Sequence, residues 1–289
     1  MANRAQFYEQ MAARTAEQIT GSYQEWTAFL ATAARLYKYP YHEQLMIYAQ
    51  RPEATACAEY DFWNKRMRRY VRRGSRGIAL VDSSGEKPSL RYVFDVADTG
   101  GGDNARRPYL WQLQDEHMDT VLRALEARYE VSGANGLEYQ LELVADRLAK
   151  DYWEDHQRDI LGIIEDSFLE EYDDYNVGAS FRSAASTSIT YTLMARCGLD
   201  PEQYFGHEDF LSVFDWNTPA AVSALGTAVS EVSEQVLRHI EVTIKRYERE
   251  KITERSQNHG ERADLHTERG LSDPGPEADG GAGGGTAGQ

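Results

Sequence analysis

Apolar residues recur every three or four positions through the first 37 residues, and this spacing predicts helices. A break between two helices is expected at Ser22, which can cap the second one. Glu25 lies three residues later and can complete a capping box. The same kind of pattern predicts a short helix over residues 42–50 and another over residues 62–69.

The pattern then changes from helices to strands. Residues 74–77 begin and end with glycine and predict a turn, and the uncharged apolar run at residues 78–81 predicts a strand. A second strand is predicted over residues 90–96. Residues 98–108 are rich in glycine and polar side chains, so we expect a flexible loop and a domain boundary there.

Helical spacing returns in the second half of the chain. Gly198 has the position of a residue that ends a helix, and Thr218 with Pro219 has the pattern of a cap followed by a first helical residue. Apolar residues almost vanish beyond residue 250, and the end of the chain is glycine-rich. The predicted helices cover residues 114–130, 139–174, 181–197 and 218–250.

Together these patterns predict an α+β protein. We expect a helix-rich N-terminal module with a short β-hairpin or small sheet over residues 1–112, and a mainly α-helical domain over residues 113–250. Residues 251–289 have the composition of a disordered linker or tail. Such an ending fits either a frayed terminus or a connection to a further module of a larger multidomain protein.

Composition places the chain among soluble globular proteins. It has 289 residues, of which 41% are hydrophobic and 27% are charged. No apolar run is long enough to span a membrane, and the N-terminus lacks the apolar stretch of a secretory signal. Cys57 and Cys197 are too few for a disulfide framework, so we expect a cytoplasmic protein in a reducing compartment.

The formal net charge of −16 argues against a protein coated with basic residues, but the charge is unevenly spread. Residues 62–76 contain seven basic residues and no acidic one. Residues 138–174 contain 13 acidic residues and three basic ones. Because salt screens interactions beyond about 8 Å, local charge decides which surface meets a phosphate.

The basic stretch also carries aromatic residues. On the predicted helix, Trp63 and Tyr70 are seven residues apart and would share a face, flanked by guanidinium groups that can grip phosphates. Aromatic rings stack on unpaired bases, with about 1–3 kcal/mol per base. The predicted nucleic-acid-binding residues are Trp63, Lys65, Arg66, Arg69, Tyr70, Arg72, Arg73, Gly74, Arg76 and Gly77.

A structural interpretation of the same residues stays open. Trp63 and Tyr70 could face the core, since aromatic residues on a helix are more often buried than exposed. The arginines could then form a solvated face that pairs with the acidic segment at residues 138–174. Such pairing would also explain why strongly basic and strongly acidic stretches occur in one chain.

A further motif runs through the basic stretch and the helix before it. Its residues are Gln44, Leu45, Ile47, Gln50, Pro52, Ala54, Thr55, Tyr60, Trp63, Val71, Gly74, Gly77 and Ile78. With these residues, about the first 110 positions resemble the N-terminal domain of ArdC-type antirestriction proteins, which occur on plasmids and integrative conjugative elements. That resemblance implies single-stranded DNA binding and a role in protecting or processing entering DNA. Similar regions also begin large conjugative-element proteins with methylase and helicase modules.

The second half of that family is a zincin-like metallopeptidase, which needs HExxH on a helix to bind zinc and activate water. Here His42-Glu43 and His207-Glu208 are followed at the second histidine position by Met46 and Leu211. A serine and threonine stretch around Thr187 occupies the place of the acidic ligand. The resemblance therefore implies a degenerate zincin-like domain without metal, cofactor or catalytic residues, and the alternative is an unrelated helical domain.

The sequence thus predicts a non-enzymatic, single-stranded DNA-binding module of a mobile-element protein. A second interpretation is an acidic scaffold, in which residues 138–174 engage a basic protein partner such as a nuclease or restriction subunit. A third, an active zinc metallopeptidase, would require a metal site that the sequence does not show.

Overall fold

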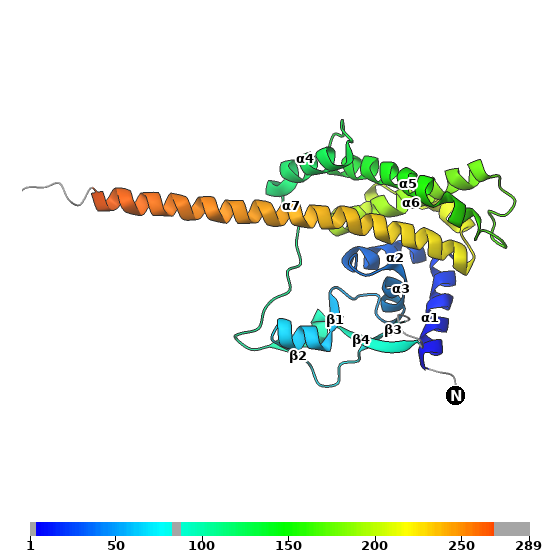
Figure 1. The fold of residues 1–289 in the computed structure, drawn as a ribbon, viewed down its shortest axis with the longest axis horizontal. Helices are drawn as coiled ribbons and strands as arrows, with labels where there is room; N and C mark the ends of the chain where they lie inside the picture. The colour runs from blue at the N-terminus through cyan, green and yellow to red at the C-terminus, as the bar shows by residue number, and fades with distance from the viewer. Residues whose placement is uncertain (1–3, 83–87, 269–289) are drawn as a thin grey trace, which may run out of the picture. The chain divides into compact units, whose positions relative to one another are not determined.

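The computed structural model describes residues 4–82 and 88–268, with side chains up to residue 253. The chain divides into two compact units, residues 1–244 and 245–289. The first unit is α+β, as predicted, because small antiparallel sheets lie in its N-terminal part and helices make up the rest (Figure 1). Among the described residues, no helix is both long and apolar enough to cross a bilayer.

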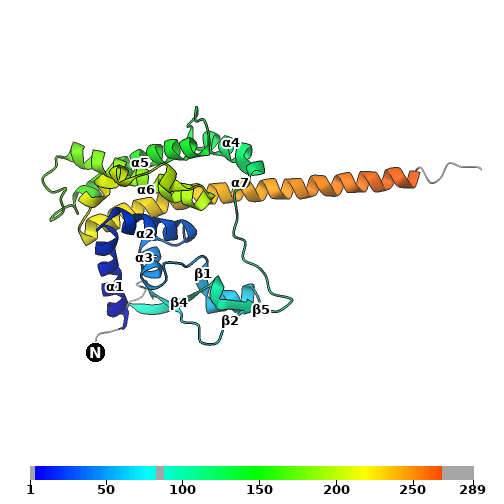
Figure 2. The same cartoon turned by 180° about the vertical axis from the view of Figure 1, so that it is seen from behind.

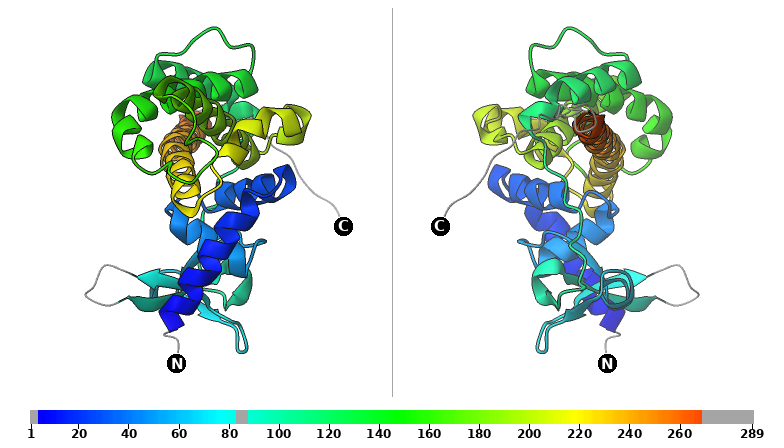
Figure 3. Two further views of the ribbon diagram at one scale, coloured as in Figure 1. Left: turned by 90° about the vertical axis from the view of Figure 1, so that its right-hand side faces the viewer. Right: turned by 90° about the vertical axis from the view of Figure 1, so that its left-hand side faces the viewer.

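Three helices begin the fold, close to their predicted positions: α1 (Arg4–Ile19), α2 (Tyr23–Arg35) and α3 (Tyr41–Gln50). Ser22 caps α2 as expected, since its hydroxyl accepts a hydrogen bond of 3.3 Å from the Glu25 amide. Helix α1 connects two layers, because Ala5 is buried against the sheet and Ile19 against the helices (Figure 3).

The predicted hairpin is confirmed as β3 (Ile78–Asp82) and β4 (Ser89–Asp95), paired antiparallel. A third strand, β1 (Cys57–Glu59), lies on the other side of β4, in a stretch for which no strand was predicted. A separate two-stranded ribbon joins β2 (Arg69–Val71) to β5 (Thr99–Gly101), and both strands were missed (Figure 2). The predicted flexible loop at residues 98–108 is therefore partly a strand.

The predicted helix over residues 62–69 is wrong. In its place stands a single π-helical turn, η1 (Phe62–Arg66), closed by a hydrogen bond of 3.1 Å from the Met67 amide to the Phe62 carbonyl. Arg68 then has a φ of 53°. A right-handed helix cannot continue through a residue in this conformation. The chain turns there into β2, so Trp63 and Tyr70 do not share a helix face.

Two polar side chains, the half-buried Gln50 and the buried Asp95, stabilise the sheet layer. The Gln50 amide acts like an extra strand, because it donates to the Ala79 carbonyl at 2.8 Å and accepts from the Ala79 amide at 2.9 Å. The Asp95 carboxylate is buried and accepts from the backbone amides of Thr55, Ala56 and Ala97 at 2.7, 3.0 and 2.8 Å. Each side chain provides hydrogen-bond partners for backbone groups of the interior. Those groups would destabilise the fold if they were left unpaired.

The second half is helical, but its boundaries differ from the prediction. The predicted helix 139–174 ends at residue 161, and the next helix begins at residue 174, because the Asp173 side chain accepts from the Asn176 amide at 2.8 Å and caps it. The elements are η3 (Asp115–His117), α4 (Met118–Tyr129), α5 (Leu137–Leu161), α6 (Asp174–Cys197), η4 (Pro201–Gln203), η5 (His207–Asp215) and α7 (Pro219–Glu268).

Both predicted helix signals around α6 and α7 are confirmed. Gly198 ends α6 with a φ of +83°, the left-handed conformation that glycine adopts easily. Thr218 accepts from the Ala221 amide at 3.2 Å and caps α7. The predicted end of this helix near residue 250 is wrong, because α7 runs to Glu268, into the stretch expected to be disordered. Residues 269–289 of that predicted tail lie outside the described residues.

The larger hydrophobic core crosses the domain boundary predicted at residue 112. It joins α2 to α5, α6 and the first part of α7, and the indole of Trp26 donates to the Ser188 hydroxyl at 3.0 Å within it. A smaller cluster lies between α1, α3 and the sheet, around Ile47 and Leu80. Residue 112 therefore separates two stretches of chain that share one core.

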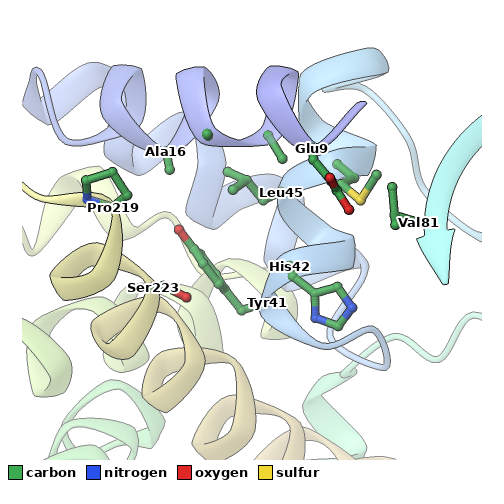
Figure 4. Close-up of a pocket in the computed structure, with 11 residues that line it drawn as sticks. Glu9, Ala16, Tyr41, His42, Leu45, Val81, Pro219 and Ser223 are labelled. Atoms are coloured by element: carbon green, nitrogen blue, oxygen red, sulfur yellow. The ribbon is translucent and has the colours of Figure 1, made fainter. Parts of the chain in front are cut away.

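A cavity of about 300 Å³ lies between α1, α3 and the start of α7. Figure 4 shows the Tyr41 ring between α1 and α7, with its hydroxyl end toward Ala16 and Pro219. In the part of the chain that the structure describes, this buried hydroxyl has no hydrogen-bond partner, and burial raises the pKa of Tyr41. The ring fits because position 226 is glycine: a Cβ atom there would lie 2.2 Å from Cε2 of Tyr41.

We expect Gly226→Ala to lower the free energy of unfolding. Overpacking a core costs about 1–3 kcal/mol, although alanine returns about 1 kcal/mol of helix propensity. Chemical denaturation would measure the change. Gly102→Ala is the matched control, because a Cβ atom there meets nothing within 4 Å. If the Tyr41 ring is the cause, the same substitution costs less in a Tyr41→Leu background; an equal cost in both backgrounds would contradict it.

Candidate nucleic-acid interface

The β2–β5 ribbon brings two basic stretches of the chain together. Tyr70 pairs with Gly100 in its register, and the Arg72 amide extends the contact by donating to the Asp98 carbonyl at 2.9 Å. On the other side, the Arg106 amide donates to the Met67 carbonyl at 2.8 Å. Residues 102–107 therefore lie beside η1 and the start of β2 (Figure 2).

Most of the predicted binding residues are at the surface of this ribbon. Arg69 and Gly77 are half-buried, and Trp63 is buried. The exposed residues are Lys65, Arg66, Tyr70, Arg72, Arg73, Gly74 and Arg76.

Trp63 is the exception, and its prediction as a base-stacking residue is corrected by its burial. Its side chain is 1% exposed, and its indole nitrogen donates to the Phe94 carbonyl at 2.9 Å. The π-helical turn points this ring inward, beneath β4, so neither of its faces is open to a base. Trp63 holds η1 on the sheet, which is the structural role that the sequence left open.

Three of the predicted cations also have structural contacts. The Arg69 guanidinium donates to the Thr99 hydroxyl at 2.7 Å across the ribbon, and Arg72 donates to the Ala97 carbonyl at 2.8 Å. Lys65 pairs with Asp61 one helical turn earlier, at 2.6 Å. Part of the hydrogen-bonding capacity of these side chains therefore serves the local fold.

Six other arginines around the ribbon are exposed, and within the described residues their side chains have neither a hydrogen bond nor an ion pair. Three of these six were missed by the sequence prediction. Two come from residues 102–107, far along the chain, and only the β2–β5 pairing shows that they belong here. The Arg-Arg pair before Pro108 was the one available signal. The six are Arg66, Arg68, Arg73, Arg76, Arg106 and Arg107.

Tyr70 is the aromatic residue best placed to meet a base. Its side chain is 58% exposed, yet its ring is held against the backbone of the opposite strand. A Cβ atom at Gly100 would lie only 2.7 Å from Cζ and Oη of this ring. Glycine at position 100 thus lets one part of the ring rest on β5 while the remainder faces solvent. A ring immobilised in this way loses little rotamer freedom when a base stacks on it.

The alternative pairing of this basic stretch with the acidic segment is not seen. Within residues 4–82 and 88–253, no ion pair joins residues 65–76 to residues 138–174. The acidic helix α5 instead forms pairs along its own surface, Arg147 with Asp151 at 3.3 Å and Lys150 with Glu154 at 3.9 Å. The arginines around the ribbon therefore remain available to an external anion.

The zinc site implied by the family resemblance does not fit the residues present. Among the described residues, no three His, Cys, Asp or Glu side chains are grouped as metal ligands. His156 on α5 stacks on the Tyr152 ring at 4.0 Å, and its Nδ1 lies 3.0 Å from the Tyr152 carbonyl oxygen. Thr187 is half-buried on α6 and offers no carboxylate.

No family model matches the chain, and no curated protein matches it. Among solved structures, the chain is similar to the metal-free crystal structure of the antirestriction ArdC protein from the R388 plasmid. The two are 13% identical with a TM-score of 0.37, and the match covers 70% of this chain and 85% of that one. The likeness is distant, so the roles of residues are taken from the contacts of this chain.

The contrast between Trp63 and Tyr70 gives a direct prediction. We expect Trp63→Phe to lower the free energy of unfolding by about 1–3 kcal/mol, because it removes a buried hydrogen bond and leaves a gap beneath β4. Oligonucleotide affinity should stay unchanged while the variant is folded. Tyr70→Ala should show the reverse, near-native stability with weaker binding. Thermal denaturation and fluorescence anisotropy measure the two effects, and lost affinity in folded Trp63→Phe would contradict the assignment.

Proposed function

We propose that this protein is a non-enzymatic single-stranded DNA-binding module, and that the β2–β5 ribbon with η1 and residues 72–77 and 102–107 forms its binding surface. The observation that carries the proposal is the set of six exposed arginines without side-chain partners around one immobilised tyrosine. Arginines of this kind supply phosphate contacts, and an exposed ring supplies a stacking surface.

The shape of the ribbon favours a single strand over a duplex. Each of its strands has three residues, and the adjoining turn η1 has five. Readers of duplex DNA usually place an α-helix or a longer β-ribbon in the major groove. Tyr70 can stack only on a base that is already unpaired, since paired bases are covered by their neighbours.

The acidic character of the whole chain makes this binding local. With a net charge of −16, most of the surface repels a polyanion. Attraction is confined to residues within about one Debye length, roughly 8 Å at physiological salt. Binding should therefore depend on a small number of phosphates and weaken steeply with salt.

The biological setting we propose is a mobile genetic element. Residues 44–78 carry the motif that resembles ArdC-type antirestriction proteins. A module that covers entering single-stranded DNA would protect it without cutting it or modifying it. Continuation of the chain into a larger conjugative-element protein would place such a module beside the enzymes that process that DNA.

A second function is favoured by one further observation. In residues 162–175, large aromatic side chains are exposed among carboxylates, with Phe168 at 67% and Tyr175 at 77% exposure. Exposed aromatic residues within a charged rim are typical of protein-binding surfaces. We propose a basic protein partner here. Titration with a labelled arginine-rich peptide tests it, with Phe168→Ser and Tyr175→Ser expected to weaken binding; unchanged affinity in both would argue against it.

Fluorescence anisotropy with a labelled oligonucleotide tests the DNA-binding proposal. We expect binding whose affinity falls with salt, because counterions are released from each phosphate that an arginine meets. The variant Arg66→Gln/Arg73→Gln/Arg76→Gln removes three charges without removing a hydrogen bond of the fold. It should reduce the slope of log affinity against log salt by about two, from about 0.7 per phosphate on a single strand.

The matched control is Arg14→Gln/Arg123→Gln/Arg158→Gln, which removes the same charge from exposed positions on other helices. It should bind like the unchanged protein. Two results would sink the proposal: no binding at low salt, or an equal loss of affinity in both triple variants. The second would show that only net charge matters.

A further inference from the structure

A small pocket of about 140 Å³ lies where four segments of the first unit meet. Its walls come from the end of α2 and the residues after it, the chain at the start of β1, residues 109–111, and Arg196 on α6. The third segment, residues 109–111, follows the arginines at positions 106 and 107 after Pro108. The pocket thus lies along the chain path that leaves the β2–β5 ribbon.

Arg196 is a half-buried cation without a carboxylate contact. Its Nη2 donates to the Trp111 carbonyl at 2.9 Å, and its guanidinium carbon lies 3.6 Å from the centre of the Trp111 ring. Within the described residues it forms no ion pair, and that one hydrogen bond leaves further N–H groups unused. Burial lowers the pKa of this guanidinium. Buried charges are normally paired, so this one points to an anion from outside the chain.

Two more cations line the same pocket. Arg35 donates only to neutral groups, among them the Ala54 carbonyl at 2.9 Å and the Pro52 carbonyl at 2.6 Å, and burial lowers its pKa as well. Lys38 is paired with Glu241 at 2.7 Å, and the Tyr37 hydroxyl donates to the same carboxylate at 2.5 Å. Asp95 and Glu53 also act electrostatically on Arg35, and Glu241 acts on Arg196, but neither guanidinium contacts a carboxylate directly within the described residues.

The thiol in the wall of the pocket carries no negative charge that would repel an anion. Cys57 borders the pocket, and burial raises the pKa of its thiol, so it is uncharged at neutral pH. The aromatic rings do not offer a base-stacking site either. Tyr37 and Trp111 are buried, and Arg196 already lies over the Trp111 ring. The chemistry of the pocket is that of an oxyanion site.

We infer that this pocket receives the terminal phosphate of the single strand that lies on the ribbon, an inference that rests on the proposed function. A terminal phosphate carries more charge than a phosphodiester and projects from the end of a chain. An internal phosphodiester needs a groove open at both ends, whereas this pocket is bounded by four segments. Arginine suits the role, because its fork of donors matches the oxygens of a phosphate.

Binding of the full chain to oligonucleotides of one sequence tests this inference. Three probes are compared: one with a 5′-phosphate, one with a 3′-phosphate, and one with hydroxyls at both ends. We expect one phosphorylated probe to bind about tenfold more tightly, the factor that one charge-assisted contact gives. Inorganic phosphate at millimolar concentration should remove this preference and leave the hydroxyl-ended probe bound.

Arg196→Gln should abolish the preference while retaining binding of the hydroxyl-ended probe. Circular dichroism checks that it folds, since this residue also contacts Trp111. If it does not fold, Lys38→Gln takes its place, because that side chain is exposed. The control is Arg158→Gln, an exposed arginine on α5. The preference should survive the control.

The possible results separate the two proposals. Equal binding of all three probes overturns the phosphate pocket and leaves DNA binding intact, as does a preference that persists in folded Arg196→Gln. If no probe binds, the DNA-binding proposal is overturned, and so is the inference that the pocket receives the terminal phosphate of a strand. In that case, binding of a nucleoside monophosphate that depends on Arg196 would identify a free phosphate compound as the ligand.

Discussion

The packing of α2 is the constraint on which the rest of the first unit depends. Trp26, Phe29 and Leu30 are almost fully buried, and Trp26 is bonded to Ser188 on α6. Leu36, at the end of the same helix, belongs to the smaller core beneath the sheet. One helix thus fills two cores, and separating the N-terminal residues from the second half would expose a tryptophan and a phenylalanine to water, at about 1.5–3 kcal/mol for each large side chain. The proposed DNA-binding surface therefore depends on the helical half for its support, although none of its own residues comes from there.

The motifs that carry the family resemblance mostly build this support. Gln50 closes the edge of β3, Thr55 donates to the buried Asp95, and Trp63 anchors η1 through the Phe94 carbonyl. Each satisfies a backbone group that would otherwise be buried without a partner. The proposed binding residues lie between these anchors, on a turn and a short strand that pairs with β5. The motif residues therefore support the fold, whereas exposure and charge indicate the proposed binding residues.

Local signals in the sequence predicted well, and pairings between distant residues did not. Ser22, Gly198 and Thr218 act at helix ends through neighbours a few residues away, and all three were predicted. Strand β2 forms because Tyr70 pairs with Gly100, thirty positions later, and its three residues carry no strand pattern of their own. For the same reason, Arg106 was not among the predicted site residues, because only a pairing between distant residues brings it to the ribbon. It also put Trp63 on the wrong side, because a seven-residue spacing indicates one face only if the helix continues, and Arg68 ends it.

The uneven charge of the chain has a physical consequence for how a strand would lie on it. The net charge of −16 opposes the approach of a polyanion, and on the proposed function the exposed arginines around the ribbon provide the favourable contacts. Like charge placed against wrong positions contributes to specificity as much as attraction at the right ones. On the proposed function, the carboxylates elsewhere on the chain disfavour contacts away from the ribbon, and residues 105–111 connect the ribbon to the pocket. A uniformly basic protein of the same size would bind DNA more tightly, but it would not hold the end of the strand at one position.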